Sequence, residues 1–237
     1  MKKQQLFFLL LLHIIGLNFA NAQKRSDNAA IEIVNKSIDA MGGQKLLQSI
    51  KTLYTDSETE MQGRKVNWIV KEMLPNKGSF QIIYQGRTVY QNWFNGKVGY
   101  ELNNGEKKLA DQEEFKDKKY KQNIFNELDY INPSLYKLEF IGEEKIESNN
   151  CNKIKATLIN GLEQILYYDK NTFLLTKTEK ILNAEKNSFS TTYYSNYKKF
   201  NDLTYFTEMK FGEKENIQIA TIIKLLYNEN ITEKDFE

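Results

Sequence analysis

The feature that most constrains the fold is a side-chain periodicity of two, which begins near residue 51 and continues to residue 227. In one segment, for example, Val66, Trp68 and Val70 occupy every second position. Successive side chains of a β-strand point to opposite faces, so this spacing predicts strands rather than helices.

Polar turns interrupt this periodicity at short intervals. Asn95-Gly96 is typical of a type I′ hairpin, and Asn149-Asn150 is expected to be another turn. Short strands, frequent turns and little helix predict a mainly β domain built as an antiparallel meander. The expected strands span residues 53–61, 64–74, 79–84, 88–94, 98–102, 136–141, 153–159, 162–168, 173–182, 188–197, 203–211 and 216–227.

One amphipathic helix is expected before the strands, over residues 27–41. Ile31, Val34, Ile38 and Met41 share one face of a 3.6-residue repeat. The glycine pair that follows should end this helix, because glycine adopts the left-handed C-terminal conformation without a Cβ clash.

Two features leave the interior of the sheet open to interpretation. Residues 110–125 are charged and contain no glycine or proline, which fits either a helix lying across a barrel or a solvated loop. Residues 217–226 are apolar on both faces. This pattern fits a sheet packed on both sides by ordinary core, or a curved sheet around a lined cavity with a helix across its mouth.

The N-terminus has the order of a secretory signal peptide. Lys2 and Lys3 precede an apolar stretch over residues 6–17, and small residues then lead to Ala22. The stretch is shorter than the ~20 apolar residues of a membrane-spanning helix. We therefore expect cleavage after Ala22, export to the periplasm, and one domain over residues 23–237 without a transmembrane span.

Composition excludes several classes of function for that mature chain. Removing Lys2 and Lys3 from 33 Lys+Arg leaves 31, which equals the 31 Asp+Glu, so no basic excess favours nucleic acid. The only histidine, His13, lies in the signal peptide, which excludes Ser-His-Asp catalysis and histidine zinc sites. Cys151 is the only cysteine, so no intramolecular disulfide forms.

Carboxylates are the remaining catalytic groups. Glu58 and Glu60 share one face of a strand, and Asp111, Glu113 and Glu114 cluster further along the chain. Paired carboxylates hydrolyse glycosides in other proteins, so a hydrolase is one hypothesis. Because acids are frequent here, solvated faces are the favoured interpretation of both groups. We expect no enzyme activity, no cofactor and no metal.

Several segments, in order along the chain, resemble bacterial outer-membrane lipoprotein-sorting proteins of the LolA type. The first is residues 38–43 (IDAMGG), and the second is residues 94–100 (FNGKVGY), similar to that family's F-D-G-x-x-G-W/Y hairpin. Residues 140–146 (FIGEEKI), 167–172 (YYDKNT) and 231–236 (ITEKDF) complete the series. No residue matches the arginine with which these carriers close their lid.

The resemblance implies a half-open antiparallel β-barrel with an N-terminal helix and a helical lid. It also implies reversible binding of a lipid or lipoprotein acyl chain, with envelope proteins as further partners, by a monomer. The alternative is a non-catalytic envelope scaffold with the same fold and no lipid ligand. The candidate ligand-binding residues, each of which also fits ordinary core, are Trp68, Val70, Phe80, Ile82, Trp93 and Tyr100.

Overall fold

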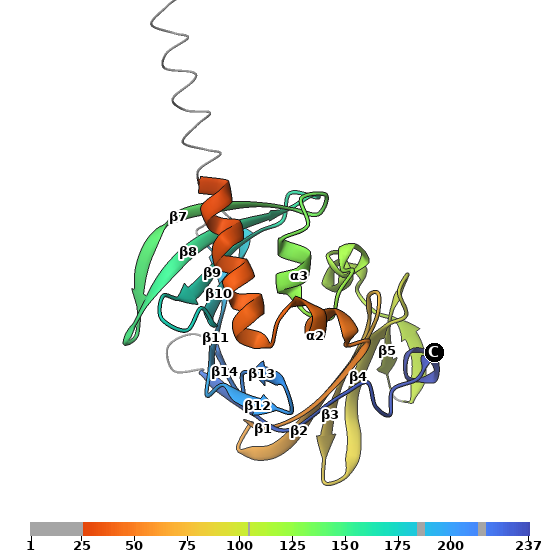
Figure 1. Ribbon diagram of the computed structural model, residues 1–237. Coiled ribbons are helices and arrows are strands. Elements are labelled where there is room, and N and C mark those ends of the chain that lie inside the picture. Colours follow the sequence, from red (N-terminus) through yellow and green to blue (C-terminus); the bar gives the residue numbers. More distant parts are fainter. Residues whose placement is uncertain (1–25, 104, 184–187, 213–216) are drawn as a thin grey trace, which may run out of the picture.

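The computed structural model describes residues 26–103, 105–183, 188–212 and 217–237. It contains one 13-stranded antiparallel sheet and a separate two-stranded hairpin. The sheet is strongly curved but not closed (Figure 1). Its strands, in the spatial order of the sheet, are β6 (Glu106–Leu109), β5 (Gly99–Asn103), β4 (Arg87–Phe94), β3 (Lys77–Tyr84), β2 (Arg64–Met73), β1 (Thr52–Met61), β15 (Gln218–Tyr227), β14 (Glu208–Phe211), β11 (Ser188–Ser195), β10 (Leu175–Asn183), β9 (Glu163–Asp169), β8 (Asn149–Leu158) and β7 (Tyr136–Ile146).

The two edge strands of the sheet, β6 and β7, follow one another in the sequence. β6 ends one edge and β7 begins the other, so residues 110–135 must run from edge to edge. This crossover segment contains the 3₁₀ helices η1 (Gln112–Phe115) and η2 (Lys118–Tyr120) and the short helix α3 (Asn126–Tyr130). The covalent chain thereby bridges the side on which the sheet is not hydrogen-bonded.

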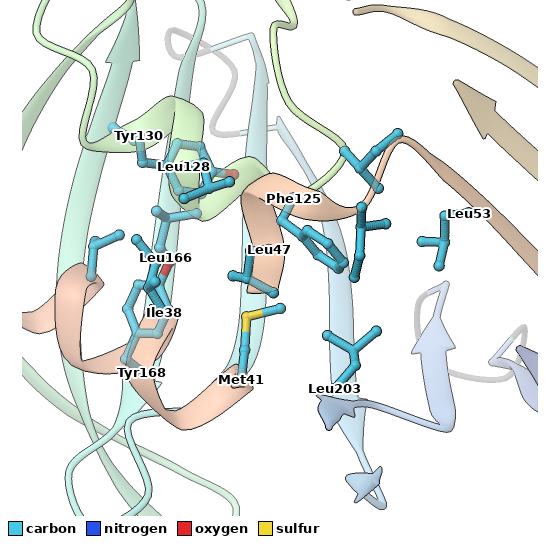
Figure 2. Close-up of a cluster of buried hydrophobic side chains, with 14 of the residues drawn as sticks. Ile38, Met41, Leu47, Leu53, Phe125, Leu128, Tyr130, Leu166, Tyr168 and Leu203 are labelled. Carbon is cyan, nitrogen blue, oxygen red and sulfur yellow. The ribbon is translucent and has the colours of Figure 1, made fainter. Parts of the chain in front are cut away.

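Helices lie inside the curve of the sheet, on its concave face (Figure 1). The N-terminal helix, described over residues 26–41, buries Val34 and Ile38 almost completely. These side chains belong to one core cluster with Leu166 and Tyr168 of β9 (Figure 2). Helix α2 (Gln44–Ser49) adds Leu47 to the same core, so the apolar faces of both helices cover the sheet.

The glycine pair between these helices has a steric reason. Gly42 has φ +129° and Gly43 has φ +91°, in the region that favours glycine. A Cβ on Gly42 would also lie 2.7 Å from the Asp202 carbonyl oxygen and 2.6 Å from Leu46. The hairpin of β12 (Lys198–Phe200) and β13 (Leu203–Tyr205) therefore closely approaches the end of the N-terminal helix.

The convex face of the C-terminal half carries a row in which lysine and tyrosine alternate. Lys153, Tyr167, Lys177, Tyr193 and Lys210 are directly paired from β8 through β9, β10 and β11 to β14. Each lysine ammonium lies 4.7–5.6 Å from a neighbouring ring centroid, within the range of cation–π attraction. Aromatic residues on this face are thus explained without a second core layer of helices.

The C-terminal end packs on the same convex face, at the opposite half of the sheet. Helix η3 (Glu233–Phe236) contacts β3, and Lys71 and Lys77 form ion pairs with Asp235 and Glu233. Phe236 is 1% exposed. The C-terminal phenylalanine that the family resemblance singled out is therefore part of the packed structure.

Several local predictions were wrong. Asn149-Asn150 begins β8 instead of forming a turn, because β7 continues to Ile146. The segment expected at residues 203–211 is divided into β13 and β14. β6, β12 and α3 were not expected. Residues 110–125, expected to be either a helix or a solvated loop, contain the two short 3₁₀ helices η1 and η2.

The predicted signal peptide, residues 1–22, lies outside the described residues. Within the described part of the chain, no helix combines the length and apolarity needed to cross a bilayer.

Candidate ligand-binding site

A cavity of about 230 Å³ lies between the concave face and the elements that cover it. Met209 contributes from β14, and Met41 contributes from the end of the N-terminal helix. The remaining lining comes mainly from the crossover segment and from the chain between β11 and β14. The cavity therefore forms only where distant parts of the sequence meet.

Five aromatic rings form much of the cavity wall. The Tyr205 and Phe206 rings are stacked with centroids 4.2 Å apart, and Tyr194 lies 4.8 Å from Phe206. Tyr197 contacts Phe206 edge-on at 6.3 Å, and Phe125 contacts Tyr205 in the same way at 6.3 Å. Such geometries are favourable for aromatic pairs and give the cavity a largely rigid wall.

Three charged side chains also line this cavity. Lys121 donates to Glu72 at 2.5 Å, which neutralises both groups. Glu127 of α3 is 7% exposed, and burial raises the pKa of its carboxyl above the usual range. The hydrogen bond from its own backbone N–H and the charge of Lys121 oppose this effect, whereas Asp129 adds to it.

An apolar patch adjoins the cavity on the same face of the sheet. Ser57, Trp68 and Ile82 are directly paired across β1, β2 and β3, and Val70 pairs with Phe80. Four of the candidate ligand-binding residues therefore share the concave face, namely Trp68, Val70, Phe80 and Ile82. They are half-buried. The structure brings four of the six predicted residues together.

Aromatic contacts extend this patch to both sides. Trp68 lies 5.5 Å from Phe80 and 5.4 Å from Phe211, and Phe80 lies 6.1 Å from Tyr90. The patch continues into the cavity, because cavity residues Glu72 and Met209 lie two positions from Val70 and Phe211 on the same strands. The apolar patch and the cavity thus form one continuous candidate site.

Trp93 and Tyr100, the other two candidates, lie on the convex face. Trp93 pairs with Ser79, whose neighbour Phe80 points to the concave side. The Trp93 and Tyr100 rings are stacked at 5.7 Å, and the Lys107 ammonium lies 5.4 Å and 4.2 Å from their centroids. These two residues are therefore separated from the apolar patch by the sheet itself.

A second cavity, of about 210 Å³, is polar. Of its two acids, Asp117 pairs with Lys180 at 2.8 Å. Asp129 accepts hydrogen bonds from the backbone N–H groups of Gln122 and Asn123 and from the Asn123 side chain. Burial raises the pKa of the lining residue Tyr136 to about 12. Because Asp129 is already held by three donors, it stabilises the loop before α3 and is not free for a ligand.

Neither predicted carboxylate group lines these cavities. Glu58 and Glu60 are exposed on the convex side of β1. Asp111 accepts a hydrogen bond from the backbone N–H of Glu113 and caps η1. Among the described residues, no group of three or more His, Cys, Asp or Glu is placed to hold a metal ion.

The crossover segment is anchored to the sheet near the apolar patch. The Phe115 ring stacks on Phe94 at 5.7 Å and lies against Gly99, where a Cβ would come within 2.3 Å of it. Gln112 exchanges two 2.9 Å hydrogen bonds with the backbone of Gly99. The second glycine of the hairpin motif is therefore needed for packing against the crossover.

Sequence reasoning missed the residues that distinguish this site, namely Glu127 and the rings between β11 and β14. The high density of aromatic residues over 193–206 is the feature that could have indicated the rings of the site, but the sequence predicts strands over most of this range. No pattern linked that stretch to α3, because their proximity depends on the long-range sheet order.

An open, curved antiparallel sheet with helices on its concave face defines the structural class, and solved structures share it. A DUF1329 family protein from Desulfovibrio piger superposes with a TM-score of 0.60 at 13% identity, and the match covers 90% of this chain and 97% of that one. A LolA superfamily protein from Nitrosomonas europaea gives 0.59 at 11% identity, covering 88% and 97%.

A third solved structure is a putative outer-membrane lipoprotein-sorting protein domain from Vibrio parahaemolyticus. Its TM-score is 0.58 at 13% identity, covering 89% of this chain and 97% of that one. No family model and no curated protein sequence matches this chain. At these identities, the likeness shows the fold: it is the fold of the LolA-like and lipoprotein-sorting structures.

Proposed function

We propose that this protein is an exported, periplasmic carrier or chaperone that reversibly binds a lipid or a lipoprotein acyl chain for outer-membrane sorting. The observation that supports it best is the apolar patch around Trp68 and Phe80, which is only half-buried although it faces the inside of the curved sheet. Neighbouring folds from lipoprotein-sorting structures support the same class of ligand.

The energetics suit loading and release without covalent chemistry. Each buried methylene contributes ~0.8 kcal/mol, so an acyl segment of roughly ten methylenes gains about 8 kcal/mol before ordering costs. Ordering costs reduce this gain, so the dissociation constant should lie above the ~1 μM that a net 8 kcal/mol would give. The protein has no need of a catalytic group in this role.

The first part of the crossover segment, residues 110–120 with η1 and η2, acts as the lid of this carrier. It is tied to β5 through Phe115 and Gln112. These contacts belong to a cluster separate from the main core, whereas Ile124, Phe125 and Leu128 further along the segment are part of the main core. The first part of the segment can therefore open while the second part stays packed. Movement of the segment would alter access to the apolar patch and so set the release rate.

A second candidate function is an envelope scaffold that holds no lipid. It is favoured by the other half of the concave face, where Leu166 and Tyr168 are fully covered by the N-terminal helix. In this alternative, the rest of the concave face would be filled by a protein partner.

The test is native mass spectrometry of the mature protein purified from a bacterial periplasm, with organic extraction of bound material. Co-purification of lipid or acylated peptide at near-stoichiometric amounts would support the carrier and identify its ligand. A clean apo mass, combined with no binding of a fluorescent probe that has an acyl chain and an uncharged headgroup, would reject the carrier in favour of the scaffold.

A further inference from the structure

Glu127 is an unusual residue for the interior of an apolar site. The residue is only 7% exposed, and it lines the cavity. Among the described residues, no lysine or arginine lies within ion-pair distance of Glu127. Within that part of the chain, the hydrogen-bond donor to its carboxyl is its own backbone N–H. Burying such an acid costs free energy unless a partner compensates it.

The charges of the cavity leave Glu127 uncompensated. Lys121 is the cation of the lining, and it is already paired with Glu72 at 2.5 Å. With both acids ionised, the cavity therefore carries one excess negative charge. An anionic headgroup would be repelled there, whereas a cationic one would supply the missing partner.

The aromatic wall favours a cation for an independent reason. Tyr197 donates its hydroxyl to the Leu175 carbonyl at 2.6 Å, and the Tyr194 hydroxyl lies 3.3 Å from that of Thr178. These hydroxyls are engaged with the protein, so the residues present aromatic surface to a ligand. Aromatic faces attract ammonium groups, most strongly where water is excluded.

The dimensions fit one headgroup beside an acyl chain. A volume of 230 Å³ compares with a share of ~30 Å³ for one water in the liquid, so the cavity holds a small polyatomic group. The apolar patch begins two residues away along β2 and β14. An amphiphile can therefore place its polar end in the cavity and its tail on the patch.

We propose that the cavity binds the ammonium headgroup of an amphiphile, with Glu127 as counter-ion and the rings of Tyr194, Tyr205 and Phe206 as a partial aromatic cage. The inference rests on the proposed function for the tail, and it adds the chemistry of the headgroup. Burial raises the pKa of Glu127 in the free protein. Binding of a cation should favour the ionised carboxylate and so release a proton from Glu127 to solvent.

The first experiment compares three ligands with the same dodecyl chain, below their micellar concentrations: the trimethylammonium, the alcohol and the carboxylate. Calorimetric titration should give at least about tenfold tighter binding of the ammonium than of the alcohol, and the weakest binding for the carboxylate. Glu127→Gln should remove the preference for the ammonium over the alcohol.

Two further variants separate binding from folding. Phe206→Leu removes one ring of the cage and should reduce the preference while the acid remains. Glu113→Gln changes an acid on the same crossover segment whose side chain is 76% exposed, and it should leave all three affinities unchanged. Near-ultraviolet circular dichroism confirms that each variant keeps its packing.

Tetramethylammonium, which lacks a tail, tests the cavity alone. It should raise the melting temperature of the wild type above that in equimolar sodium chloride, and it should have no such effect on Glu127→Gln. Equal affinities for all dodecyl ligands would overturn the ammonium site but retain the carrier. Binding of tetramethylammonium without binding of any dodecyl ligand would overturn the carrier but retain the ammonium site. If neither binds, both proposals are wrong.

Discussion

The hydroxyl of Tyr167 donates a 2.8 Å hydrogen bond to the carboxylate of Glu179 on the convex face of the sheet. Glu179 also pairs with Lys177 at 2.5 Å, and the Lys177 ammonium lies 4.7 Å from the Tyr167 ring centroid. Burial alone would raise the pKa of Glu179, but the hydrogen bonds from Lys177 and Tyr167 outweigh it and lower that pKa. The three side chains form one charged network across β9 and β10.

Tyr167→Phe should lower the free energy of unfolding by about 2 kcal/mol, because it removes a hydrogen bond to a charged group. Urea denaturation at neutral pH measures this. The pKa of Glu179 is lowered in the folded state, so its contribution is present above the unfolded value of about 4.5 and is lost as the pH falls through the folded value. The difference between wild type and variant should therefore shrink in acid. Tyr193→Phe serves as the control, with a change below about 0.5 kcal/mol.

The two tryptophans report on opposite faces, since Trp68 lies in the apolar patch and Trp93 lies on the convex face. Addition of a fatty-acid ligand should change tryptophan emission in the wild type and in Trp93→Phe, and the change should be lost in Trp68→Phe. Steady-state fluorescence titration is the measurement. The opposite assignment, with the signal lost only in Trp93→Phe, would place the ligand on the convex face.

Glu127→Gln should stabilise the protein at neutral pH. The folded pKa of Glu127 is raised above 4.5, so wild-type stability falls as the pH rises from about 4.5 through the folded value. Each unit of pKa shift corresponds to ~1.4 kcal/mol. Asp129 is shifted in the same direction in both proteins, so the difference between them isolates Glu127. Melting temperatures from pH 4 to 8 should show a gap that opens with rising pH; a constant gap would contradict the assignment.

Gly42→Ala should cost about 1–3 kcal/mol more than Gly43→Ala. Both positions have positive φ, so both variants carry backbone strain of about 1–3 kcal/mol. Only at Gly42 does a Cβ meet other atoms, at Asp202 and Leu46. Urea denaturation of the matched pair checks the prediction, and equal costs would show that the hairpin of β12 and β13 yields freely.

Phe115→Ala should speed the release of a bound fatty-acid probe severalfold, because it detaches the crossover segment from Phe94 and Gly99. Stopped-flow displacement with excess unlabelled ligand gives the rate. Phe115→Leu keeps most of the apolar contact and should change the rate much less. An unchanged rate in Phe115→Ala would mean that this segment is not the lid.

The strands could be predicted because their periodicity is local, but the faces of β4 and β5 could not. From the tight turn at Gln85-Gly86, a regular register would place Trp93 on the face of Phe80. The register shifts between Ile82 and Ile83, and one extra residue in β4 moves Trp93 to the other face. The bulge shifts the alternation of faces by one residue at Val89, and no glycine in β4 marks its position.

The cavity could not be predicted for a different reason. Glu127 is one acid among many in the sequence, and only burial by α3 and the sheet distinguishes it. Its aromatic neighbours lie more than 60 residues later, in β11 and in the chain between β11 and β14, where the sequence predicts two strands over 188–197 and 203–211. These residues come together because of the order of the strands in the sheet. The spacing of polar and apolar residues along the chain does not reveal that order.

The position of β15 has a consequence for when the protein becomes functional. β15 lies between β1 and β14, and Thr59 bonds to the Ile219 carbonyl across 160 residues of sequence. Among the described residues, the ladder of backbone hydrogen bonds passes from one half of the sheet to the other through β15. Folding dominated by such distant pairings is slow, since loop closure precedes the stabilising contacts. A polypeptide that lacks β15 would leave β1 and β14 without the strand that pairs with both, so it should not form the continuous sheet.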